Sequence, residues 1–62
     1  MDRLEAFEKM LADIQSQAEY EAGELKRMEA EGRKKTALYR QYLGNRLMYK
    51  RLFDKYREYG LV

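Results

Sequence analysis

Apolar residues recur along the chain at alternating steps of three and four over two long segments. In the first segment the repeat covers eight successive positions, seven of them apolar: Leu4, Phe7, Leu11, Ile14, Ala18, Glu21, Leu25 and Met28. This spacing forms the seam by which one helix packs along another at a shallow crossing angle. The pattern therefore predicts a long first helix, with Gly23 tolerated in its interior because the repeat continues in register beyond it.

The second segment carries the same repeat with a different chemistry. Its seam is rich in tyrosine and contains one amide: Leu38, Tyr42, Asn45, Tyr49, Leu52, Tyr56 and Tyr59. Met48 and Phe53 lie beside this seam, so the apolar stripe is broader than a contact between two helices requires.

Helix-boundary signals divide the chain between the two segments. Asp2 followed by Glu5 resembles a capping box at the start of the first helix. Gly32 suits the left-handed residue that ends a helix, and a short connection implies antiparallel neighbours. These signals predict one all-α helical-hairpin domain over 1–62, with a first helix at about 2–31, a turn at about 32–34 and a second helix at about 35–59. If Thr36 serves as the N-cap, the second helix begins at Ala37 instead.

A second apolar row follows the second helix on the side away from its seam. Tyr39, Leu43 and Leu47 are spaced four residues apart, and a hairpin alone has no neighbour to cover them. Either Leu47 is simply exposed, or another helix covers the row. A chain of 62 residues without Cys or His also lacks the cross-links that usually stabilise small domains. We therefore expect a homo-oligomer, a dimer or larger assembly that forms a four-helix bundle, with this row as the interface.

The middle of the hairpin is polar on both helices. Folding at the turn pairs positions whose numbers add up to about 65, which places Glu21 opposite Asn45. With Arg46 these residues are candidates for a hydrogen-bonded polar layer that fixes the register of the helices. The alternative is that they occupy ordinary half-exposed positions in a loosely packed centre.

Charge is divided between the two halves of the chain. Residues 1–31 contain nine acidic and four basic residues, a net charge of −5, whereas residues 32–62 contain nine basic and two acidic residues, a net charge of +7. Candidates for binding an anion or nucleic acid lie at the turn and along the second helix: Arg33, Lys34, Lys35, Arg40, Lys50 and Arg51. The alternative is that these charges serve solubility and pairing within the hairpin, with Glu29 and Glu31 compensating the turn.

Composition narrows the functional class. The absence of His and Cys, with only two Ser or Thr residues, argues against an enzyme, a metal site and a bound cofactor. No apolar run suggests a signal peptide or a membrane span, so we expect a cytoplasmic location. The favoured function is a small non-catalytic interaction or regulatory protein that acts on itself or a protein partner through helix–helix contacts. The alternative is a nucleic-acid-binding hairpin that uses the basic face of the second helix and the turn.

The predicted architecture resembles one known group of proteins. A hairpin of about 60 residues with a short turn looks like the protomer of the plasmid copy-number regulator family, which pairs into four-helix bundles and binds RNA. The resemblance is limited to architecture. The Cys of those hairpins has no counterpart here, and none of their RNA-contacting residues is carried over.

Overall fold

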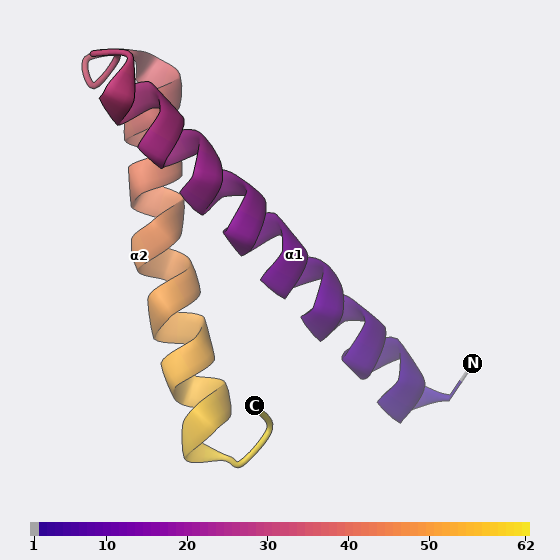
Figure 1. Ribbon diagram of the computed structural model, residues 1–62. Helices are drawn as coiled ribbons and strands as arrows, with labels where there is room; N and C mark the ends of the chain where they lie inside the picture. Colours follow the sequence, from indigo (N-terminus) through magenta and orange to yellow (C-terminus); the bar gives the residue numbers. More distant parts are fainter. Residues whose placement is uncertain (1) are drawn as a thin grey trace.

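The computed structural model describes residues 2–62 as two antiparallel helices joined by a short turn (Figure 1). Helix α1 covers Arg3–Ala30 and helix α2 covers Ala37–Glu58. Within the described residues there is no strand. The predicted all-α hairpin is confirmed.

Helix α1 begins and ends at the residues that its sequence signals indicated. The Glu5 backbone N–H donates a hydrogen bond of 2.8 Å to the Asp2 side chain, which caps the first turn. At the other end Gly32 has a φ of 73°, and the Arg33 N–H bonds the Met28 carbonyl at 2.8 Å. This pattern satisfies carbonyls that the end of a helix leaves unpaired.

The turn is longer than the predicted 32–34, and Thr36 is the reason. Its Oγ1 accepts a hydrogen bond from the Tyr39 N–H at 3.2 Å and donates one to the Arg33 carbonyl at 3.1 Å. Thr36 has extended backbone angles and acts as the N-cap. Helix α2 therefore begins at Ala37, the alternative start, rather than at residue 35, and it ends at Glu58.

The core is small and extends along the contact between the helices, from Met28 near the turn to Leu11 in the first half of α1. Its buried apolar side chains are Leu11, Leu25, Met28 and Tyr49. Farther from the turn, the Phe7 and Tyr56 rings pack edge to face with their centroids 5.8 Å apart.

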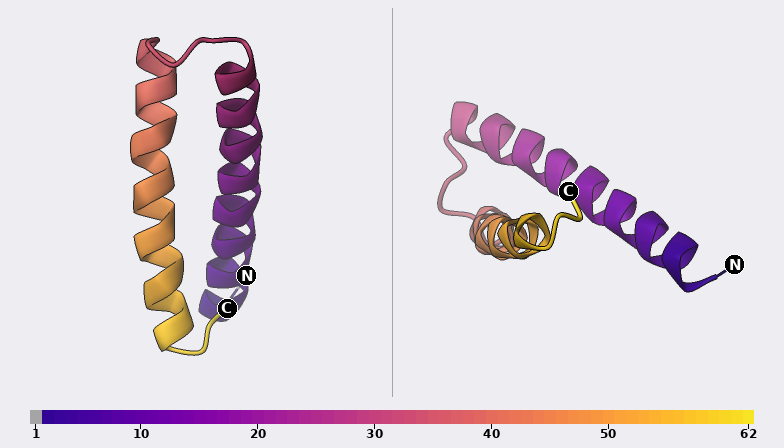
Figure 2. Two further views of the ribbon diagram at one scale, coloured as in Figure 1. Left: turned by 60° about the vertical axis from the view of Figure 1, so that its left-hand side comes forward. Right: turned by 90° about the horizontal axis from the view of Figure 1, so that it is seen from below.

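The two ends of the predicted seam do not belong to this core. Leu4 is 66% exposed and Tyr59 is 74% exposed, and Leu38 is exposed as well. Figure 1 shows the helices diverging away from the turn, and the view from below in Figure 2 shows α1 running obliquely past α2, which is seen nearly end on. Because helices that cross obliquely face each other with different sides along their length, a straight seam leaves the contact at its ends.

The hairpin forms a single layer of helices. Its principal extents are 44 × 24 × 16 Å, and no third helix packs on the pair within the described residues. Both broad faces of the pair therefore lie open.

Candidate interaction surfaces

The most buried polar group is the Glu21 carboxylate, at the centre of the contact between the helices. Glu21 is only 4% exposed. It accepts one hydrogen bond from the Asn45 amide and one from the Tyr49 hydroxyl, each 2.9 Å long. A buried carboxylate without hydrogen-bond partners is costly, and both partners of Glu21 come from α2. The two bonds therefore fix which part of α2 lies beside Glu21.

This cluster contains two of the three residues proposed for the polar layer. Glu21 and Asn45 meet directly, whereas Arg46 is exposed and makes no hydrogen bond or ion pair with the carboxylate. Arg46 follows Asn45 directly, so its side chain leaves the helix about 100° away. Tyr49 is the member that the pattern missed. Its spacing of four residues from Asn45, together with the need of a buried phenol for a partner, indicates its role.

Two tyrosines of α2, Tyr49 in this cluster and Tyr42, have raised pKa values. Burial raises the pKa of Tyr49, and the hydrogen bond and negative charge of Glu21 raise it further. The pKa of Tyr42 is also raised, first by burial and then by Tyr20, Glu21 and Glu24. Both phenols therefore stay protonated at physiological pH.

Two ion pairs that share Arg27 lie on the surface of the last turns of α1. Arg27 bonds Glu24 one turn earlier and Glu31 at 3.3 Å. The hydrogen bond from Arg27 lowers the pKa of Glu24 and raises that of the guanidinium. Arg27 and its two carboxylate partners are all accessible to solvent, so these ion pairs order the surface near the turn without adding much stability.

The second apolar row lies on the surface of α2. Leu47 is 61% exposed and Leu43 is 41% exposed, whereas Tyr39 is half-buried. Leu47 stands between two hollows of 560 and 290 Å³, lined respectively by Leu43, Arg46, Leu47 and Lys50, and by Gly44, Leu47, Met48 and Arg51. The row is therefore an uncovered ridge of leucine between basic side chains.

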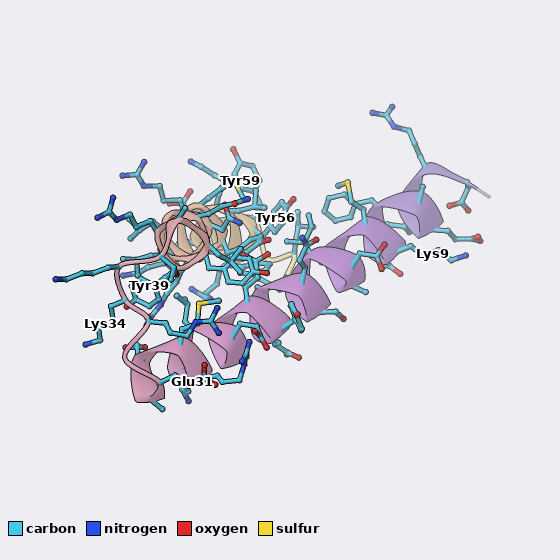
Figure 3. All side chains as sticks on the ribbon, turned by 90° about the horizontal axis from the view of Figure 1, so that it is seen from above. Lys9, Glu31, Lys34, Tyr39, Tyr56 and Tyr59 are labelled. Carbon is cyan, nitrogen blue, oxygen red and sulfur yellow. The ribbon has the colours of Figure 1, made fainter. Side chains whose placement is uncertain are left out.

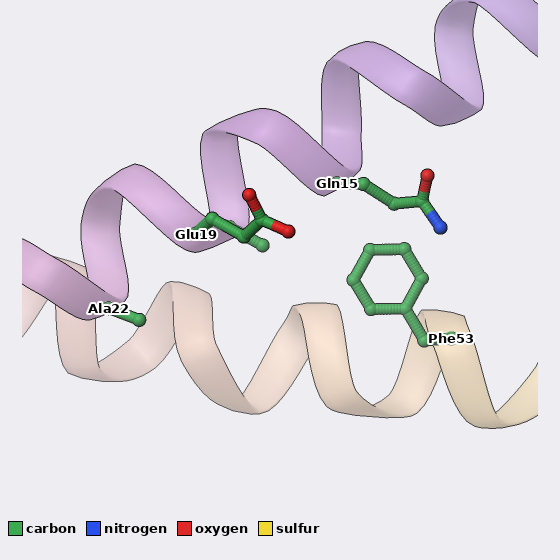
Figure 4. Close-up of a pocket in the computed structure, with 5 residues that line it drawn as sticks. Gln15, Glu19, Ala22 and Phe53 are labelled. Carbon is green, nitrogen blue, oxygen red and sulfur yellow. The ribbon is translucent and has the colours of Figure 1, made fainter.

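A shallow cavity of 390 Å³, wide open to solvent, lies between the helices to one side of the core. From α1, Gln15, Glu19 and Ala22 reach this space, and from α2 the Phe53 ring closes it (Figure 4). Ala18 is the fifth lining residue. The two alanines leave the space unfilled, and the Glu19 carboxylate stands at its rim.

The basic candidates separate into paired and unpaired groups. At the turn, Arg33 bonds Glu31 at 3.2 Å, whereas Lys34 and Lys35 are exposed and make no ion pair with the described residues. Four cations of α2 are likewise exposed, without an ion-pair partner among residues 2–62: Arg40, Arg46, Lys50 and Arg51. Figure 3 shows nitrogen-tipped side chains radiating from α2 on the side away from α1.

Other kinds of site are not found in residues 2–62. They contain no group of three or more Asp, Glu, His or Cys side chains that could hold a metal ion. Neither helix is both long and apolar enough to cross a membrane. No protein-family model, no curated protein and no solved structure matches the chain. Its function must therefore be inferred from its surfaces.

Proposed function

We propose that this chain is a small non-catalytic interaction protein that acts through helix–helix contacts, first of all with copies of itself. In this proposal two hairpins associate into a four-helix bundle. Regulation would follow from association, because each copy gains or loses a partner as its concentration changes.

The observation that carries the proposal is the excess of exposed surface. The hairpin exposes 5159 Å², whereas a compact monomer of 7.5 kDa is expected to expose about 4,250 Å². The excess of about 900 Å² matches the ~800 Å² that each partner buries in a standard protein–protein interface. The radius of gyration, 14.0 Å, likewise exceeds the ~10.6 Å expected for a compact domain of this length.

The arrangement of the helices supports the same proposal. Stable domains bury their apolar surface between at least two layers of secondary structure. A second hairpin laid on one broad face would supply the missing layer. Large apolar side chains are exposed on both helices, among them Met10, Leu43, Leu47 and Met48.

The test is the molecular mass in solution. We expect light scattering after gel filtration to give at least twice the 7.5 kDa of one chain. Leu47→Glu should lower this mass toward that of the monomer, because it places a charge on the exposed apolar row that association is proposed to cover. The control is Leu61→Glu, at a leucine of similar exposure beyond the end of α2. It should leave the mass of the wild-type assembly unchanged. An unchanged mass for Leu47→Glu would contradict the use of this row.

The unpaired cations of α2 favour a second candidate, a nucleic-acid-binding hairpin. Binding to RNA or DNA through these side chains should weaken log-linearly with salt, since each phosphate contact releases counterions. A filter-binding titration from about 50 to 200 mM salt measures that slope. No retention at the lowest salt concentration would exclude this candidate.

A further inference from the structure

The exposed features of the two helices are complementary to each other. Helix α1 contains seven acidic and four basic residues, a net charge of −3, and α2 contains six basic and two acidic residues, a net charge of +4. The stretch 37–53 of α2 has no carboxylate at all. Helix α2 presents an exposed leucine ridge, and α1 presents a cavity floored by alanines.

We infer that Leu43 of this ridge docks against the Ala18–Ala22 cavity on α1 of a second copy, with Arg46 paired to Glu19 across the interface and Leu47 at the edge of the contact. This inference rests on the proposed self-association and specifies its geometry. By two-fold symmetry the second copy makes the same contact in return, so that each ridge meets a cavity.

Residue register supports these particular pairs. Within the hairpin, contacts join positions whose numbers add up to about 65: Glu21 bonds Asn45, and Phe7 packs on Tyr56. A two-fold axis parallel to the helices places both turns at the same end, so α2 and the second copy's α1 run antiparallel in the same register. That register sets Leu43 at the height of Ala22 and Arg46 at the height of Glu19.

Shape and orientation agree with this register. The cavity of 390 Å³ is shallow and open to solvent, so an aliphatic side chain of a second copy can reach its alanine floor. On α2, Arg46, Lys50 and Phe53 are spaced four and three residues apart, so they share one side of the helix. Because Phe53 lines the cavity, the cavity and the basic flank of the ridge open toward the same face of the hairpin.

Charge selects this arrangement over its main alternative. When α2 contacts the second copy's α1, every pair of adjacent helices in the bundle joins an acidic helix to a basic one. The alternative places α2 beside α2, which brings the unpaired Arg46 and Lys50 of both copies together. Like charges across an interface are strongly disfavoured, so electrostatics determines which helices are neighbours.

A charge exchange tests the pairing. Arg46→Glu alone and Glu19→Arg alone each place like charges at both symmetric contacts, and we expect the dimer Kd to rise about tenfold in each case. When the two variants are mixed, every contact in the mixed dimer is complementary again. Native mass spectrometry, with one variant isotopically labelled, should therefore show the mixed dimer in clear excess. The control is Lys34→Glu mixed with Glu19→Arg, which should show no such preference.

The outcomes separate this inference from the proposed function. If the wild-type chain is dimeric but the exchanged variants mix at random, the docking geometry is wrong and self-association stands. A monomeric wild-type chain overturns both.

Because the chain has no Cys, Leu47→Cys provides an independent check. It should resist disulfide formation, since the two α2 helices stand at opposite corners of the bundle, and rapid cross-linking would overturn the geometry.

Discussion

At the scale of single residues, Glu21 is the position on which the hairpin register depends. It is the one charged side chain buried within residues 2–62, and both of its hydrogen-bond donors come from the opposite helix. Sliding α2 by one turn would leave a buried carboxylate without partners, which costs far more than an ordinary surface contact. The cluster therefore specifies one alignment of the helices.

Tyr49→Phe should reveal the strength of this cluster. Removing the hydroxyl leaves Glu21 with one donor fewer, and we expect the free energy of unfolding to fall by about 1–3 kcal/mol. Chemical denaturation followed by circular dichroism measures this change. Tyr56→Phe is the matched control, because the Tyr56 hydroxyl makes no hydrogen bond with the described residues. Equal stability of the two variants would show that the buried bond contributes little.

The raised pKa of Tyr49 predicts a loss of stability at high pH. An unfolded tyrosine ionises at a pKa of about 10, whereas burial and Glu21 hold the folded group protonated to higher pH. Above pH ~10 the unfolded state therefore binds fewer protons than the folded state, and stability falls as pH rises. Tyr49→Phe should reduce this dependence. Parallel slopes for both proteins between pH 9 and 11 would contradict the prediction.

The polar cluster shows how much a repeat pattern reveals about single positions. Glu21 and Asn45 could be predicted because both interrupt an apolar seam at matching heights. Tyr49 was counted among the apolar seam residues, and the pattern does not indicate where its hydroxyl points. The cavity at Ala18 and Ala22 was not predictable either, because its volume depends on how far the crossing helices separate.

At the scale of helices, the signals at their ends determined where each begins and ends. Asp2, Gly32 and Thr36 each satisfy backbone groups that the helix itself leaves unpaired. The three-four repeat predicted two helices but not their divergence. A straight seam implies parallel axes, whereas the crossing angle depends on side-chain packing that a linear pattern does not contain.

Two glycines of this hairpin should respond to alanine with opposite signs. Gly23 lies inside α1 with open space around its Cα, so Gly23→Ala should raise stability by about 1 kcal/mol. Gly32 ends the same helix at a φ of 73°, where alanine is strained, and Gly32→Ala should lower stability by about 1–2 kcal/mol. Thermal unfolding of the two variants and of the wild-type chain measures both changes in stability. A stabilising Gly32→Ala would contradict the left-handed helix end.

At the scale of the whole molecule, the hairpin has more surface than it can bury by itself. Among residues 2–62, four buried apolar side chains form the core, while ten large apolar residues are exposed. A single layer of this size has little stability to spare, and a second layer would bury about as much surface as a standard interface. Folding and association should therefore be coupled.

Sedimentation equilibrium combined with circular dichroism over a dilution series tests this claim most directly. We predict that the mass falls toward 7.5 kDa and that the helical signal declines over the same range of concentration. A dilute sample that keeps its full helicity at the mass of one chain would contradict the account.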